Sequence, residues 1–120
     1  MKRIATVLFL AAVLIPISSA NAQFATGNQL LAHCQDEEDA ERQAYCYGYS
    51  QGVADFFGPL HQQPGGTQCP PAGVNGDQIR EVMIRYLEQN PEHLHLTGAV
   101  LAMLSITSTW CPDSRVLEWQ

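Results

Sequence analysis

The sequence predicts an all-α protein: a small single-domain bundle of about four helices, stapled by two disulfide bonds. Apolar residues recur at helical spacing in several segments, most regularly between residues 79 and 87. Clusters of proline and glycine separate these segments and mark the loops. The chain has four cysteines, and an even number in a short exported chain is typical of a disulfide framework.

The first 22 residues have the pattern of a secretory signal peptide. Lys2 and Arg3 precede an apolar run over residues 4–17, and Ala20 and Ala22 fit the small-residue rule for cleavage before Gln23. A stable anchor needs about 20 apolar residues, so an uncleaved anchor is the weaker alternative. We expect one mature domain over residues 23–120, in the bacterial periplasm, with no stable membrane anchor after cleavage.

The mature chain is strongly acidic. Without Lys2 and Arg3 it keeps four arginines and no lysine against 12 carboxylates, a net charge of −8. This composition argues against a nucleic-acid partner, because phosphate binding needs clustered basic side chains. It suits a basic protein partner, although the charge can equally serve solubility alone.

Two helices are predicted in the first half of the mature chain, over residues 26–33 and 38–57. An acidic run stands at the start of the second, where carboxylates favour the positive end of the helix dipole; partner binding is the alternative reading. This run is Asp36, Glu37, Glu38 and Asp39. An apolar stripe at helical spacing is expected to face the core. This stripe is Tyr45, Tyr49, Val53 and Phe56.

The second helix also carries small residues four apart, at Ala44, Gly48 and Gly52. Glycine costs up to about 1 kcal/mol inside a helix, so the sequence predicts that another backbone packs closely there. Gly58 and Pro59 should end the helix. Residues 60–73 then read as an exposed loop, in which His61, Gln62 and Gln63 join the acidic run as candidate partner-binding residues.

The second half of the chain predicts a helix over residues 76–89 and another over residues 91–110. Asn75 and Gln78 have the spacing of a capping box, and Pro91 suits the first position of a helix. The last helix is apolar over much of its circumference and is the best candidate for the centre of the bundle. The short link makes these two helices antiparallel neighbours. That arrangement pairs Cys69, just before the one helix, with Cys111, just after the other. Cys34 ends the first predicted helix and Cys46 lies within two to three turns of the start of the second, so we expect these two to pair as well.

Residues for catalysis or metal binding are scarce. The sequence lacks the serine-hydrolase, phosphate-loop and zinc-protease motifs. His93 and His95 are two apart and would not chelate from one helix face. Asp55 stands among apolar neighbours, but a helix-surface or capping role is favoured over a buried catalytic acid. We therefore expect a non-enzyme with no catalytic residue, no cofactor and no metal.

One segment supports a family resemblance. Cys46, Gly48, Tyr49, Gly52 and Asp55 resemble the C-x-G-Y-x-x-G-x-x-D signature of the Rap/Tai family. Further short matches follow in the same order up to Cys111, so that the resemblance covers residues 30–112. The family often closes with a Phe-Pro-Cys ending, whereas this chain has Trp110-Cys111-Pro112.

The resemblance implies a periplasmic all-α immunity protein, often dimeric, that occludes a peptidoglycan amidase delivered by a type VI secretion system. The first hypothesis is accordingly an inhibitor that binds such a toxin, with a homodimer as a further expectation. The alternative is a structural or chaperone-like envelope protein without a toxin target. A hydrolase is a distant third reading, because no catalytic constellation is present.

Overall fold

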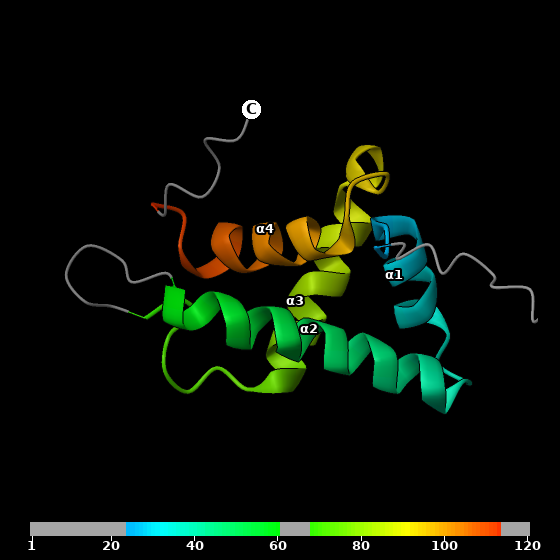
Figure 1. Ribbon diagram of the computed structural model, residues 1–120, viewed down its shortest axis with the longest axis horizontal. Helices are drawn as coiled ribbons and strands as arrows, with labels where there is room; N and C mark the ends of the chain where they lie inside the picture. The colour runs from blue at the N-terminus through cyan, green and yellow to red at the C-terminus, as the bar shows by residue number, and fades with distance from the viewer. Residues whose placement is uncertain (1–23, 61–67, 114–120) are drawn as a thin grey trace, which may run out of the picture.

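The computed structural model describes residues 24–60 and 68–113. These residues form four α-helices and one short 3₁₀ helix (Figure 1). The elements are α1 (Gly27–Gln35), α2 (Ala40–Leu60), α3 (Gly76–Gln89), η1 (Pro91–His93) and α4 (Gly98–Trp110). The described residues contain no strand, and Thr26 and Thr97 form an isolated antiparallel bridge. The predicted all-α class is confirmed.

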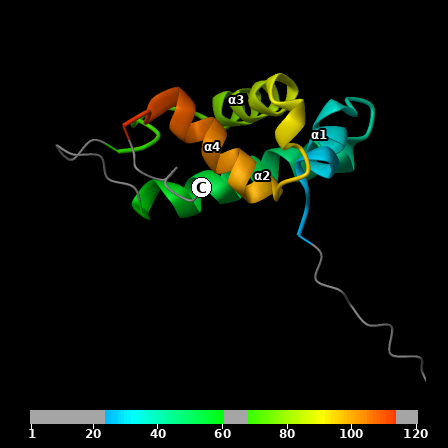
Figure 2. The ribbon, with the colours of Figure 1, turned by 90° about the horizontal axis from the view of Figure 1, so that it is seen from above.

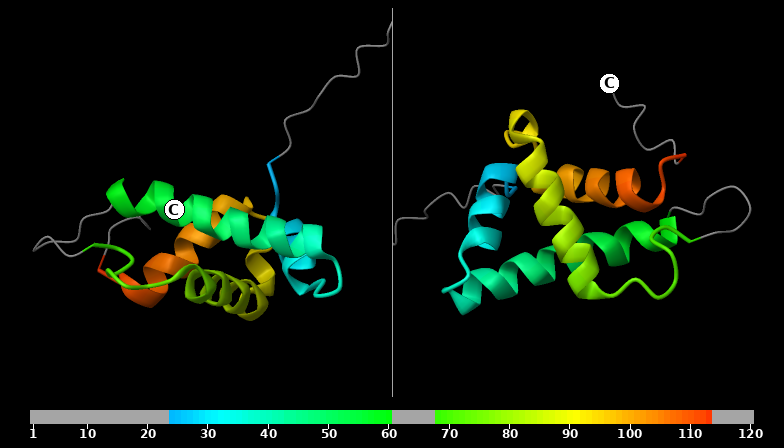
Figure 3. Two further views of the ribbon diagram at one scale, coloured as in Figure 1. Left: turned by 90° about the horizontal axis from the view of Figure 1, so that it is seen from below. Right: turned by 180° about the vertical axis from the view of Figure 1, so that it is seen from behind.

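Helix α3 crosses behind both α2 and α4 (Figure 1) and contacts each of them. Seen from above, α4 runs obliquely in front of the long helix α2 (Figure 2). Short helix α1 closes one end. Each of the four α-helices contacts the other three, so the arrangement does not single out α4 as the central helix that the sequence predicts. α3 crosses α4 at an angle rather than lying antiparallel beside it (Figure 3).

Both predicted disulfide bonds are present. Cys34 and Cys46 join α1 to α2 with their Cα atoms 5.1 Å apart, and Cys69 and Cys111 are bonded with their Cα atoms 6.0 Å apart. Each bond belongs to its own cluster of buried side chains. The first cluster is centred on Leu30, Met83, Leu87 and Leu101, and the second on Ala54, Phe57, Ile79 and Ile106.

Helix α3 matches its prediction most closely. Its bounds are those expected, and the capping box between Asn75 and Gln78 is present in both directions. Its apolar stripe is buried, except that Tyr86 is only half-buried. All these signals lie within one stretch of 15 residues, so neighbouring helices have little influence on where this helix begins and ends.

The predicted start of the last helix, at Pro91, is wrong by seven residues. The chain forms η1, then turns, and α4 begins only at Gly98. Residues 94–98 instead bind the start of α1: the N–H of Gly27 donates to the carbonyl of Leu96 (2.9 Å), and that of Asn28 donates to the carbonyl of Leu94 (2.9 Å). The first N–H groups of a helix lack partners within it, and this contact supplies them.

The predicted end of the second helix is also corrected. Gly58 and Pro59 lie inside α2, which ends at Leu60 rather than at Phe57. Proline in the last turn keeps a helical φ and costs one hydrogen bond, so the helix can continue past it. The predicted loop over residues 60–73 therefore starts later, and residues 61–67 of it lie outside the described residues.

Candidate functional site

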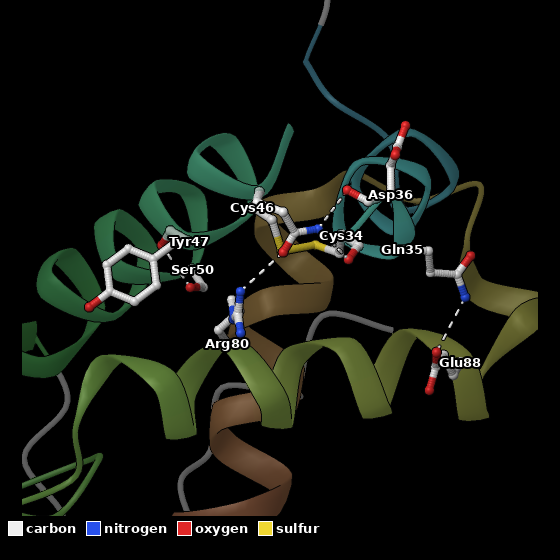
Figure 4. Close-up of a disulfide and its surroundings, with 9 residues drawn as sticks. Cys34, Gln35, Asp36, Cys46, Tyr47, Ser50, Arg80 and Glu88 are labelled. Atoms are coloured by element: carbon white, nitrogen blue, oxygen red, sulfur yellow. Dashed lines mark hydrogen bonds between the residues drawn. A yellow bond between two sulfur atoms is a disulfide. The ribbon is translucent and has the colours of Figure 1, made fainter. Parts of the chain in front are cut away.

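The corner between α1 and α2 is tied to α3 through one glutamine. The side-chain amide of Gln43 donates to the carbonyls of Cys34 (3.0 Å) and Asp36 (2.9 Å). Its oxygen accepts a hydrogen bond from Arg80 on α3 (3.1 Å). Figure 4 shows this network beside the Cys34–Cys46 disulfide, with the Asp36 side chain turned away from it. The corner is therefore held in place by covalent and hydrogen bonds together.

The acidic run occupies this corner and has mixed roles. Asp39 caps α2, because its carboxylate accepts hydrogen bonds from the N–H groups of Glu41 (2.9 Å) and Arg42 (3.1 Å). The Arg42 guanidinium also lies 3.1 Å from the Asp36 carboxylate and 3.5 Å from that of Asp39. Glu37 and Glu38 are exposed, and neither forms an ion pair with another described residue. Capping thus explains part of the run, and two carboxylates face outward.

The expectation that the apolar stripe of the second helix faces the core is confirmed for Tyr49 and Val53 and wrong for Tyr45 and Phe56. Phe56 is 69% exposed and Tyr45 is 41% exposed, whereas Tyr49 and Val53 are half-buried at the edge of the core. The face of α2 that points inward carries smaller residues. It consists of Cys46, Ser50, Ala54 and Phe57.

The Cys34–Cys46 bond accounts for this rotation. Because Cys46 must point at α1, the residues four, eight and eleven positions later also point inward. Tyr45 and Phe56 each precede an inward residue by one position, which turns them about 100° towards solvent. The buried hydroxyl of Ser50 is satisfied within the helix, where it donates to the carbonyl of Tyr47 (2.8 Å).

The small-residue stripe is likewise exposed, which corrects the second prediction for this helix. A Cβ atom added at Gly48 or Gly52 would meet no described atom within 4 Å. Close backbone packing occurs instead at Gly27, where an added Cβ would lie 3.0 Å from both the Cα and the carbonyl oxygen of Leu94. Gly48 and Gly52 therefore leave open space beside Tyr45 and Phe56 on the outside of the molecule.

A hollow of about 450 Å³ adjoins the last turns of α2. Asp55 is its one carboxylate. Pro59 has no N–H, so it cannot donate the usual helical hydrogen bond to the carbonyl of Asp55. The hollow is lined by Ala54, Asp55, Gly58, Pro59, Gln68 and Pro70. A carboxylate at an open hollow suits the end of a basic side chain.

The remaining titratable residues do not assemble a reactive centre in the described part of the chain. The ring centroids of His33 and Tyr45 lie 4.7 Å apart. The Nδ1 atom of His95 is hydrogen-bonded to the backbone carbonyl of Glu92 at 3.0 Å. Within residues 24–60 and 68–113, no three histidine, cysteine or acidic side chains cluster as a metal site would require. None of the helices described here combines the length and apolarity needed to span a membrane.

Two tyrosines at the helix contacts have shifted pKa values. Burial raises the pKa of Tyr49; the neighbouring Tyr45 raises it further, and a hydrogen bond from the backbone of Ala99 lowers it. Burial also raises the pKa of Tyr86, with a smaller contribution from Glu92. Both shifts reflect packing rather than a reactive role.

The predicted signature residues divide between two surroundings. Tyr49 lies at the edge of the core, whereas Gly48, Gly52 and Asp55 are exposed on α2. The acidic run lies at the opposite end of the same helix from the hollow. The other predicted partner-binding residues, His61, Gln62 and Gln63, lie outside the described residues, as does the predicted signal peptide.

Together these features define a class: a small helical protein, rigidified by two disulfides, with exposed apolar and acidic surface along one helix. Residues 26–112 match the sequence model of the Rap1a immunity proteins. This match spans most of the chain, which therefore belongs to the Rap1a immunity protein family. No curated protein and no solved structure gave a significant match.

Proposed function

We propose that this chain is a periplasmic immunity protein that neutralises a peptidoglycan-cleaving amidase toxin delivered by a type VI secretion system. The observation that carries the proposal is membership of the Rap1a immunity protein family over residues 26–112. The amidase and the secretion route come from the Rap/Tai resemblance of the segment between Cys46 and Asp55.

The periplasm is proposed from the amino terminus and the cysteines. Residues 1–22 have a basic start, an apolar run and a small-residue cleavage pattern. The four cysteines form two disulfide bonds, which persist in oxidising compartments such as the periplasm. An inhibitor exported there would meet a toxin that attacks the cell wall.

This protein would neutralise the toxin by binding to it, without any chemical reaction. A domain held by two disulfides loses little conformational freedom when it binds, and this lowers the cost of forming a tight complex. Its acidity would speed the encounter with a basic toxin surface, an effect that weakens as salt approaches physiological strength, where the Debye length is about 8 Å. A rigid surface laid across the amidase cleft would exclude the peptidoglycan substrate.

Co-expression tests this function. Each type VI amidase of the same genome is exported to the periplasm of a host cell, with or without this protein, and lysis is followed by culture density. The proposal predicts protection by the full chain. A variant lacking residues 2–22 is the matched control, and it should stay in the cytoplasm without protecting.

If no amidase of that genome is bound or neutralised, the amidase proposal fails. The structural or chaperone-like envelope protein without a toxin target then takes its place. A homodimer, which the Rap/Tai resemblance also implies, is measured separately by light scattering of the purified mature protein.

A further inference from the structure

The outward face of α2 is an apolar surface that the rest of the described chain leaves uncovered. We define it as Tyr45, Gly48, Gly52, Asp55, Phe56 and Leu60. Phe56 and Leu60 are 69% and 63% exposed. They continue the helical spacing of Tyr49 and Val53, which are partly buried against the core. Several exposed large apolar side chains on one face of a small soluble protein typically mark an interaction site.

The two glycines add a separate feature to this face. An alanine at either position would meet no described atom within 4 Å and would favour the helix by up to about 1 kcal/mol. The fold therefore does not require glycine at Gly48 or Gly52. The open strip that the two glycines leave beside Tyr45 and Phe56 admits the backbone of another protein.

The charges around the outward face favour one kind of occupant. Glu41 and Asp55 are exposed on α2 itself, and Glu37 and Glu38 lie just before it. The nearest cation in sequence, Arg42, is already paired with Asp36 and Asp39. A second copy of the chain would bring the same carboxylates against this face, whereas a partner with lysine or arginine around an apolar cleft would complement it.

The hollow beside Asp55 completes this assignment. It adjoins the last turns of α2, on the C-terminal side of Gly48 and Gly52, and its one carboxylate belongs to Asp55. A long basic side chain from the partner fits such an opening, since its apolar stem can lie along Pro59 and Pro70.

We propose that the outward face of α2 is the surface on which the toxin docks, with Phe56 as its apolar anchor and Asp55 as the acceptor for a basic toxin side chain. The inference rests on the proposed function. It differs from the sequence expectation, which placed partner binding in the acidic run and the loop over residues 60–73.

The test measures dissociation constants between the mature protein and the amidase against which the wild type protects. Phe56→Ala removes the anchor and Gly48→Leu fills the open strip; each should weaken binding at least tenfold. Asp55→Asn should weaken it several-fold, and less so at high salt. Val100→Ala and Thr109→Leu, at exposed positions of α4, are matched controls that should bind like the wild type.

Circular dichroism and light scattering keep the outcomes distinct. Native helical content in the α2 variants, together with weakened binding, supports the assignment. Unchanged binding by Phe56→Ala and Gly48→Leu overturns it and leaves the proposed function standing. A homodimer that dissociates in Phe56→Ala without loss of toxin binding overturns it in favour of a second copy. A wild type that neither binds nor protects against any amidase overturns the proposed function itself.

Discussion

The two faces of α2 differ in almost every respect. The inward face is narrow and built from Cys46, Ser50, Ala54 and Phe57, all but one of them small. The outward face holds larger apolar groups, at Tyr45, Phe56 and Leu60, and the two glycines. One helix thus buries its smaller side chains and exposes most of its larger ones.

The inward face of α2 serves the folded core, whereas we assign the outward face to the binding of a partner. If burial alone had set the rotation of α2, the aromatic stripe would face the core, because burying Tyr45 and Phe56 removes more apolar surface from water. The covalent bond from Cys46 to Cys34 fixes the other rotation. Tyr45 and Phe56 then lie outside both core clusters, which is the physical basis for assigning them to a partner.

The largest expected effect contrasts adjacent phenylalanines. Phe57 is 1% exposed in the second core cluster, so Phe57→Ala should lower the free energy of unfolding by about 3–5 kcal/mol. Phe56→Ala should change it by no more than about 0.5 kcal/mol. Urea unfolding of the two variants makes the comparison. Equal losses would mean that Phe56 is covered in the folded protein.

Replacing a glycine by alanine should change the stability by a smaller amount, and in opposite directions at Gly27 and Gly48. Gly27→Ala should destabilise by about 1–3 kcal/mol, because the new Cβ would press on the backbone of Leu94. Gly48→Ala should stabilise by about 0.5–1 kcal/mol, since it improves helix propensity in open space. Thermal unfolding of both variants measures the difference. A destabilised Gly48→Ala would show that another backbone packs against that face.

Neutralising the acidic run should affect the fold little. Asp36, Glu37, Glu38 and Asp39 are replaced together by Asn and Gln. The Asp39→Asn change keeps a side chain that can cap α2, and the lost ion pairs with Arg42 are exposed and worth at most about 1 kcal/mol. Stopped-flow association with the toxin should slow at low salt, whereas the dissociation rate should stay near that of the wild type. Faster dissociation of the toxin from this variant would indicate that the toxin docks on the acidic run rather than on the outward face of α2.

Alkaline pH is expected to have the smallest effect on stability, through Tyr49 on α2 and Tyr86 on α3. The raised pKa values of Tyr49 and Tyr86 stabilise the fold below the usual tyrosine value of about 10, and this contribution is lost as pH rises through the folded pKa. The melting temperature should fall above pH 10, and less steeply in the double variant Tyr49→Phe/Tyr86→Phe. An identical slope in that variant would contradict the burial of these hydroxyls.

Local signals made parts of the fold predictable. The capping box and the unbroken apolar period of α3 lie within one segment. The four cysteines could be paired from their positions along the predicted helices, although α3 and α4 cross at an angle rather than lying antiparallel. The start of α4 at Gly98 could not be predicted from Pro91. The backbone carbonyls of Leu94 and Leu96 form hydrogen bonds with the start of α1, which lies about 70 residues earlier in the sequence.

The candidate site was predicted only in part. The sequence indicates Gly48, Gly52 and Asp55 as signature residues, but it also predicts that the glycines face a neighbouring backbone and that Phe56 faces the core, whereas all four residues are exposed. One signal would have corrected this: pairing Cys46 with Cys34 already requires the face of Cys46 to point inward, and Phe56 lies about 80° from that face. The apolar pattern and the disulfide predict different rotations of α2 about its axis, and the observed rotation is the one that the disulfide requires.

The most direct test of the two-faced helix is hydroxyl-radical footprinting of the mature protein, alone and with the amidase that it neutralises. The account predicts rapid labelling of Phe56 and Tyr45 in the free protein, strong protection of both in the complex, and protection of Phe57 in either state. Labelling of Phe56 that is slow in the free monomer, or unchanged in the complex, would contradict it.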